Sequence, residues 1–242
     1  MKVFGLGDLH LSLSGPFNPQ SGETAACLKP MDIFGRGWQG YVGKIYHNWR
    51  GIVGPADAVL VPGDISWGMS LEDCTYDWDF LAQLPGTIYI CRGNHDYWWQ
   101  GIGKVRQSLP PNVVPLNHDS AVVGGRAVCA TRGWLLPGVP EWKGHDEVVY
   151  KRELLRLEMA LTEGAKHNLP LVAMTHYMPL YKTCQKSDFT ALMEQYGVTM
   201  SIYGHLHGED CARTINGNYF GIDFVNLSCD CLEFVPRLLW EG

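Results

Sequence analysis

The sequence predicts a mixed α/β sandwich rather than a simple parallel sheet. Short apolar runs alternate with helical segments over most of the chain, whereas strands dominate its last part. Side chains that can ligate metal ions directly follow several apolar runs, and the crevice of an α/β sheet lies beyond the carboxyl ends of its strands. A length of 242 residues suits one large domain. We therefore expect residues 1–242 to form a single domain with a binding site at the strand ends.

Apolar runs bounded by turn residues predict the strands. The pair Gly124-Gly125 separates two such runs and predicts a β-hairpin. In the tail, Asn216-Gly217 is a strong signal for a second hairpin turn. The expected strands cover residues 2–7, 58–61, 87–91, 121–123, 126–130, 171–175 and 198–203.

Helices are predicted between these strands. The clearest covers residues 147–168, where three leucines repeat at helical spacing. Ser187 or Asp188 can cap a further helix, which Gly197 would stop. Two others are expected over residues 39–52 and 71–84.

Residues 14–50 form a long segment rich in Gly, Pro and aromatic side chains. Its first part shows weak periodicity and is expected to be a loop. Long ordered loops in compact domains are usually functional. Because this segment leaves directly from the end of the first predicted strand, we expect it to shape one rim of the substrate cleft.

The charge argues against nucleic acid and membranes as partners. The formal net charge is −6, so the field of the whole chain does not attract polyanions. No apolar run approaches the roughly 18 residues of a transmembrane helix, and the N-terminal apolar run is too short for a signal peptide. A phosphate group would have to be attracted locally, by metal ions and a few arginines.

Eight cysteines raise the question of disulfides. In a large chain without an export signal, reduced thiols are the expectation. Cys229-x-Cys231 does not have a zinc-ribbon spacing, and we interpret it as two small residues at a strand turn. The expected location is therefore cytoplasmic.

Five short clusters carry side chains that bind transition metals. Each alone has an ordinary explanation as a turn or a strand end. Together, two Asp, one Asn and at least four His are more ligands than one ion can use, so the set indicates two ions. In chain order the clusters are Asp8-x-His10, Gly63-Asp64, Gly93-Asn94-His95-Asp96, His176 and Gly204-His205-x-His207.

This order resembles the pattern of the calcineurin-like metallophosphoesterase superfamily, which is D-x-H, G-D, G-N-H-D/E, H and G-H-x-H. The similarity extends from Asp8 to His207, and every ligand position of the pattern is filled. The resemblance implies a four-layer α/β/β/α sandwich, in which two mixed β-sheets are flanked by helices.

The resemblance also implies seven metal ligands around two ions, with the carboxylate of Asp64 shared between them. Imidazole and carboxylate together suit Mn, Fe or Zn better than Mg or Ca. A bridging carboxylate holds two ions roughly 3.5–4 Å apart, as two-metal hydrolysis requires. Besides the shared Asp64, the first ion would take Asp8, His10 and His207, and the second would take Asn94, His176 and His205.

Such a centre predicts hydrolysis of a small phosphorylated substrate. A water shared by two ions is acidified and becomes a hydroxide nucleophile near neutral pH. By the resemblance, His95 lies beside the substrate and Asp96 orients it. His95 can then protonate the leaving oxygen or donate a hydrogen bond to the phosphoryl group. Both a monoester and a diester substrate are compatible with these residues.

Two departures narrow the class of phosphoesterase. Protein Ser/Thr phosphatases of the superfamily carry G-D-x-x-D-R, whereas Asp64 is followed here by the sequence ISWG, which lacks that arginine. Purple acid phosphatases have a tyrosine iron ligand three residues after the Asp, where this chain has Trp67. The chain is more similar to the small stand-alone bacterial phosphohydrolases of the superfamily.

Three further residues are candidates for contact with the substrate. Arg92 precedes the Asn94 cluster and Arg132 follows a predicted strand, so either could bind phosphate, with a surface ion pair as the alternative for both. Trp67 could wall a pocket for a base or an aryl group, and core packing is its alternative role.

Two other functions compete with that of an active phosphoesterase. A catalytically weak metal-binding module, acting through protein interactions, would be expected to have lost ligands or the catalytic histidine, and none is lost here. A metallo-β-lactamase-type hydrolase also uses two metals, but its H-x-H-x-D-H run is absent from the sequence.

Overall fold

The first of two mixed β-sheets carries the N-terminal half of the site. The computed structural model describes residues 1–20 and 26–242. Strands β1 to β4 of this sheet run parallel, and β11 returns antiparallel beside β1. The strand order is β11 (Arg237–Glu241), β1 (Lys2–Gly5), β2 (Ala58–Val61), β3 (Thr87–Ile90) and β4 (Val113–Pro115).

The second sheet carries the remaining part of the site. Its four inner strands run parallel, and the two edge strands, β5 and β9, are antiparallel to their neighbours. The order is β5 (Ser120–Val123), β6 (Arg126–Thr131), β7 (Leu171–Thr175), β8 (Val198–Tyr203), β10 (Ile222–Asn226) and β9 (Gly217–Tyr219).

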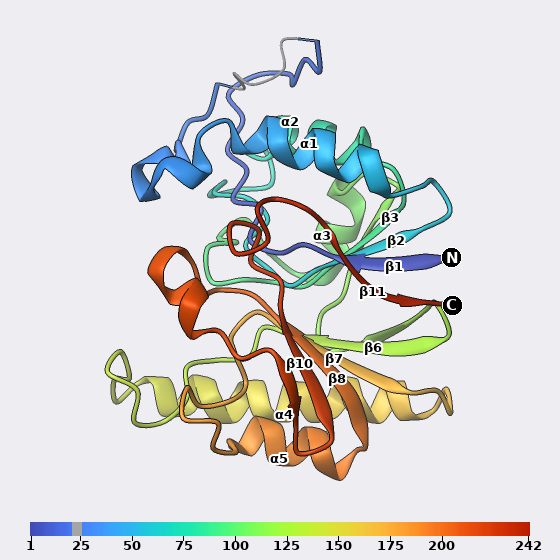
Figure 1. Ribbon diagram of the computed structural model, residues 1–242, viewed down its shortest axis with the longest axis vertical. Helices are drawn as coiled ribbons and strands as arrows, with labels where there is room; N and C mark the ends of the chain where they lie inside the picture. Colours follow the sequence, from blue (N-terminus) through green and yellow to red (C-terminus); the bar gives the residue numbers. More distant parts are fainter. Residues whose placement is uncertain (21–25) are drawn as a thin grey trace.

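Helices cover the outer face of each sheet (Figure 1). The result is the four-layer α/β/β/α sandwich, so the predicted fold class is confirmed. Helices α1 (Tyr41–Ile52), α2 (Thr75–Ala82) and α3 (Ile102–Ser108) pack on the first sheet, and α4 (Asp146–Ala165) and α5 (Asp188–Gln195) pack on the second. Three short 3₁₀ helices are η1 (Met31–Phe34), η2 (Arg36–Trp38) and η3 (Gly208–Arg213).

The inner strands are buried on both faces, which explains their continuous apolar runs. In β2, Val59 and Val61 face the helices, whereas Ala58 and Leu60 face the second sheet. This alternation follows from the two-residue period of a strand. Each sheet therefore separates two apolar layers, one under its helices and one shared between the sheets.

The chain ends lie together at one edge of the sandwich (Figure 1). The Met1 amine donates to the carbonyl of Gly242 at 3.0 Å. The parallel strands start at this edge, so their carboxyl ends gather at the opposite edge, and the motif loops gather with them. Among the described residues, no helix is long and apolar enough to cross a membrane.

Most predicted elements are confirmed, but one turn is wrong. Gly124 and Gly125 form the predicted hairpin turn with φ of 51° and 74°. In the tail, by contrast, the turn between β9 and β10 is Phe220-Gly221, with φ of 57° and 78°. Asn216 instead accepts a hydrogen bond from the Asn226 amide through its side chain at 3.0 Å.

The expectation of reduced cysteines is also wrong for one pair. Cys211 in η3 and Cys231 form a disulfide. Their Cα atoms lie 5.3 Å apart because η3 folds back beside the loop after β10, and this separation is ordinary for a disulfide. No other disulfide is found among the described residues. The argument for a cytoplasmic location from reduced thiols therefore loses its force.

A buried carboxylate ties the strand ends of the first sheet to the helix layer. Asp77 of α2 is 1% exposed. It accepts hydrogen bonds from the Leu13 amide at 2.8 Å and from the Ser66 hydroxyl, which lie beyond β1 and β2. Burial is the main cause that raises the pKa of Asp77 to about 6.

This raised pKa makes folding stability depend on pH with a defined sign. The unfolded carboxyl has a pKa of 3.8, so the folded state binds more protons between pH 4 and 6. The contribution of Asp77 is fully present below pH 4 and is lost as the pH rises through 6. Relative to Asp77→Asn, the wild-type free energy of unfolding should fall by about 3 kcal/mol over this range.

Denaturant titrations in chelator at pH 4 to 8 measure this difference without interference from metal release. The exposed Asp79 of the same helix provides the control, and Asp79→Asn should keep the wild-type pH profile. A constant difference between wild type and Asp77→Asn at all pH values would show that Asp77 titrates normally.

Candidate metal centre

The predicted metal ligands come together where the strand ends of the two sheets meet. Asp8 and Asp64 follow β1 and β2 of the first sheet, and Asn94 follows β3. His176 directly follows β7 of the second sheet, and His205 and His207 follow β8. Because the carboxyl ends of parallel strands share one edge, segments far apart in sequence meet here.

Two glycines of the motifs are required because a carboxylate lies too close to each of them for any side chain to fit. A Cβ on Gly93 would lie 2.0 Å from Oδ1 of Asp64. A Cβ on Gly204 would lie 2.3 Å from Oδ2 of Asp8. Real Cβ atoms do not approach so closely, so each glycine makes room for a carboxylate.

Several ligand candidates have left-handed backbone, which is uncommon for residues other than glycine. Such residues cost free energy and persist where the surroundings impose them. Here the Asp8 amide donates to the Gly63 carbonyl at 3.0 Å, and the His10 amide donates to the Asp64 carbonyl at 3.0 Å. The φ angles are 57° at Asp8, 45° at His10, 52° at Asp64 and 73° at His205.

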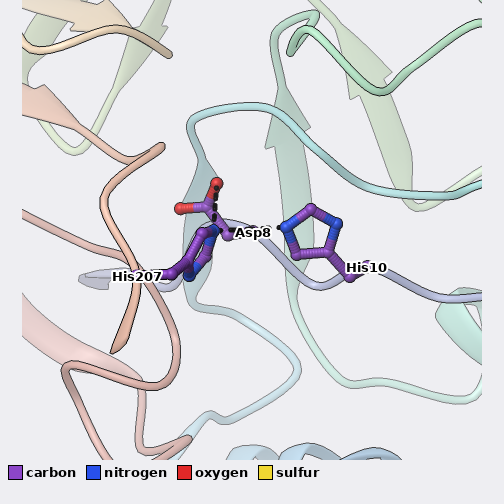
Figure 2. A group of neighbouring side chains, drawn as sticks. All are labelled: Asp8, His10 and His207. Atoms are coloured by element: carbon purple, nitrogen blue, oxygen red, sulfur yellow. Dashed lines mark hydrogen bonds and ion pairs between the residues drawn. The ribbon is translucent and has the colours of Figure 1, made fainter. Parts of the chain in front are cut away.

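Asp8, His10 and His207 form one group of donor atoms, and their side chains point toward one another (Figure 2). The Nε2 atoms of His10 and His207 lie 3.2 Å apart. His207 Nε2 also lies 3.4 Å from Asp8 Oδ1. Asp8 is fully buried, and its carboxylate accepts the His205 amide at 3.0 Å. That bond joins the first sheet to the second.

Asn94, His176 and His205 form a second group. The Asn94 carbonyl oxygen lies 2.6 Å from His176 Nε2 and 2.9 Å from His205 Nδ1. These two nitrogens lie 3.2 Å apart. His176 Nδ1 is 2.9 Å from the Pro62 carbonyl, which fixes the N–H there and leaves a lone pair on Nε2 facing the group.

Asp64 lies between the two groups. Its Oδ2 is 3.8 Å from His10 Nε2 and 3.4 Å from His176 Nε2. Its Oδ1 accepts the His95 amide at 2.8 Å. One carboxylate oxygen therefore faces donor atoms of both groups, which is the position that a shared ligand requires.

The protonation of the histidines suits cation binding. Burial lowers the pKa of His10, His176 and His205, the last to about 3, so their imidazoles are neutral and can ligate at neutral pH. His207 differs, because Asp8 and Asp230 outweigh burial and raise its pKa to about 10. Carboxylates that attract a proton this strongly attract a metal cation in the same place.

Burial and the charge of Asp8 raise the pKa of Asp64 to about 8. The Nδ1 atom of His10 is buried without a hydrogen-bond partner among the described residues. Imidazole nitrogens that face one another and a carboxylate that is hard to ionise are both stabilised by a cation between them. The donor set therefore fits divalent transition ions.

Asp230 is a further candidate residue of the site, and the sequence did not reveal it. Its Oδ1 lies 2.9 Å from His207 Nδ1, and its Oδ2 accepts the Gly208 amide at 2.8 Å. A carboxylate on the far nitrogen fixes the tautomer of a metal-binding histidine. The only sequence signal was an acidic residue between two cysteines.

His95 and Trp67 lie beside the first group without belonging to it. The ring centroids of Trp67 and His95 are 4.2 Å apart, and Trp67 stacks on His10 at 5.0 Å with an angle of 25°. His95 is half-buried, and its Nδ1 lies 3.4 Å from the Tyr97 hydroxyl. Burial, followed by the charges of His176 and His207, lowers the pKa of His95 to about 4.

The predicted orientation of His95 by Asp96 is not found. The carboxylate of Asp96 is fully buried and turns toward the loops, because the tight turn places main-chain amides around it. Its hydrogen-bond donors among the described residues are the amides of Asp64, Ile65, Ser66 and Gly93 and the indole N–H of Trp98. Asp96 therefore joins the loop after β2 to the loop after β3, and it does not orient the imidazole of His95.

The described part of the 14–50 segment reaches the first group. Trp38 is 2% exposed, and its ring centroid lies 5.9 Å from that of His10 and 5.6 Å from that of His207. The Tyr41 hydroxyl donates to the His10 carbonyl at 2.7 Å. The segment therefore packs against His10 and His207. Its role as a rim of the substrate cleft stays a prediction.

A cavity of about 180 Å³ adjoins the second group. His205 forms part of its wall, and the Tyr177 ring packs on His205 with centroids 4.3 Å apart. Trp134, Leu136 and Leu180 supply apolar wall. An apolar group attached to a phosphate held at the centre would find room here.

Comparison with known proteins agrees with this geometry. The chain matches the family model described as calcineurin-like phosphoesterase over residues 1–209. No curated protein matches the sequence significantly. Phosphopantetheinyl hydrolase from Mycobacterium tuberculosis is similar in structure, with a TM-score of 0.51 at 15% identity over 100% of this chain and 96% of that one. A protein of unknown function from Aquifex aeolicus has a TM-score of 0.50 at 14% identity over 98% and 95% of the two chains.

The likeness to both solved structures concerns the fold, because the identities are low. The family match spans every motif from Asp8 to His207. The protein belongs to the calcineurin-like phosphoesterase family.

Proposed function

We propose that the protein hydrolyses a phosphate ester with the help of two divalent transition-metal ions, Mn, Fe or Zn. The observation that carries the proposal is the position of Asp64, whose Oδ2 faces donor nitrogens of two separate ligand groups. Asp8, His10 and His207 would hold the first ion, and Asn94, His176 and His205 the second. The bound ions supply an acidified water as nucleophile and positive charge against the phosphoryl group.

The chain itself supplies orientation and a proton. Asp230 keeps His207 Nε2 directed at the first ion site, and the Pro62 carbonyl does the same for His176. His95 presents Nε2 toward the substrate while Tyr97 lies at its Nδ1. The negative charge of a bound phosphate favours protonated His95, and the proton then passes from Nε2 to the leaving oxygen.

The substrate is a small phosphorylated molecule, either a monoester or a diester. Trp67 lies beside His95, where it can contact the ester, and the cavity next to His205 can receive an apolar substituent. The alternative of a catalytically weak metal-binding module has less support, since the sequence fills every ligand position of the family pattern.

Elemental analysis of metal-loaded protein should give two transition ions per chain. Asp64→Asn should lower occupancy of both sites, because Asp64 faces both groups, whereas His207→Ala should mainly empty the first. Asp230→Asn should reduce affinity at the first site by roughly 10- to 100-fold. The exposed His167 serves as control, and His167→Ala should retain both ions. One ion or none in the wild type would contradict the dinuclear proposal.

His95→Ala should lose far more rate on alkyl phosphates than on nitrophenyl phosphates. An alkoxide needs a proton to leave and a nitrophenolate needs little help, and general acid catalysis contributes typically ~10²–10⁴-fold. Steady-state kcat/KM on a series of leaving groups measures the difference, with metal content checked in parallel. Tyr97→Phe should change the pattern little. Equal losses across the series would mean that His95 stabilises phosphoryl charge.

Asp96→Asn should weaken both metal sites without any change to a ligand. An amide NH₂ would face main-chain N–H groups that the carboxylate now accepts, and each unsatisfied buried donor costs about 1–3 kcal/mol. Chelator competition and thermal unfolding measure the two effects. Asp57→Asn is matched, because Asp57 also accepts two main-chain amides, at 2.7 and 2.9 Å, but lies at the opposite edge. Asp57→Asn should lower the stability and leave the metal affinity unchanged. If Asp96→Asn also leaves the metal affinity unchanged, Asp96 does not hold the loops in place for the metal sites.

A further inference from the structure

A second cavity, of about 130 Å³, lies beside the metal centre and is lined by arginines. Arg92, Arg132 and Arg156 contribute to its wall, together with one acidic residue, Glu153. It differs from the cavity next to His205, whose wall is mainly apolar. The chain as a whole has a net charge of −6, so a small cavity lined by three guanidinium groups is a local concentration of positive charge.

Glu153 organises the arginines but does not neutralise them. It is fully buried, and its Oε1 lies 2.7 Å from Arg156 and 3.6 Å from Arg132. Its Oε2 accepts the Thr131 hydroxyl at 2.9 Å. One carboxylate against three guanidinium groups leaves two positive charges in excess at the cavity wall.

Two of the arginines have donors that the protein does not use. The Nε atoms of Arg92 and Arg132 are buried, and neither has a hydrogen-bond acceptor among the described residues. Leaving a buried donor unpaired costs the free energy of its lost hydration. Such groups in a native protein call for an acceptor from outside the chain. The Arg132 guanidinium also stacks on Trp134, with its Cζ 4.3 Å from the ring centroid, and this contact restricts the orientation of the guanidinium plane.

The cavity is linked to the metal centre through both of these arginines. Arg92 stands two residues before Asn94, so their Cα atoms are at most about 7 Å apart. The Arg132 carbonyl accepts the His176 amide at 3.0 Å. Asn94 and His176 are ligands proposed for the second ion, so a substrate held there lies next to the arginine cavity.

We propose that this cavity binds a second phosphate group of the substrate, distinct from the one that is cleaved. Two excess positive charges match a phosphate monoester, which carries about −1.5 to −2 at neutral pH, better than a carboxylate. Guanidinium groups pair with phosphate through two parallel hydrogen bonds. This inference rests on the proposed function and narrows the substrate to molecules with two phosphates.

The test compares Arg92→Gln and Arg156→Gln with Arg152→Gln in metal-loaded protein. Arg152 is exposed and lies 3.9 Å from Glu153, but it does not line the cavity, so its variant removes the same charge from outside. Turnover is measured on adenosine 5′-monophosphate and adenosine 3′,5′-bisphosphate. The ratio of kcat/KM for bisphosphate over monophosphate should fall roughly 10- to 100-fold in the two cavity variants, through KM, and should not change in Arg152→Gln.

Equilibrium dialysis with inorganic phosphate separates this proposal from the catalytic one. Wild-type protein should bind one phosphate that withstands removal of the metals and disappears in Arg92→Gln and Arg156→Gln. If turnover is absent altogether but this binding persists, the hydrolytic function fails and the anion site stands. Phosphate binding that is unchanged in both cavity variants, or an unchanged substrate ratio, would overturn the proposal.

Discussion

The carboxylates of Asp8 and Asp64 lie within 4.8 Å of His176 and of each other, and both are almost completely removed from water. Two ionised carboxylates in such a place repel strongly, and burial penalises each of them. Burial and this repulsion raise the pKa of Asp64, and the negative charge of Asp8 contributes to the raised pKa of His207. In the proposed centre a pair of divalent cations would relieve this repulsion, and most features of the strand-end edge hold the two carboxylates in place for them.

The supporting features belong to the main chain as much as to side chains. Gly93 and Gly204 leave space for the two carboxylates, and left-handed backbone at Asp8 and Asp64 turns them inward. Asp96 accepts amides from the loops after β2 and β3, and the amide of His205 donates to Asp8 across the two sheets. The site is thus preorganised by hydrogen bonds that exist without substrate, which is what the proposed hydrolysis would require.

The sequence predicted the fold and indicated which candidate ligands would gather at one edge, because both depend on local patterns. Apolar runs that end at ligand residues mark buried strands, and every predicted ligand lies in one of the two groups or between them. Asp230 was missed because its contact with His207 joins segments 23 residues apart without a motif. The Cys211–Cys231 bond and the Phe220-Gly221 turn were missed for a similar reason, since tertiary packing decided both against local signals. Asp96 was found, but its true partners are amides, which a sequence does not display.

A crystal structure of manganese-loaded protein, with anomalous diffraction recorded above and below the manganese absorption edge, tests the central claim most directly. The account predicts two anomalous peaks per chain that flank Asp64. One would be bounded by Asp8, His10 and His207, and the other by Asn94, His176 and His205. A single peak, or peaks confined to another group of possible ligands such as Cys211, Asp230 and Cys231, would contradict it.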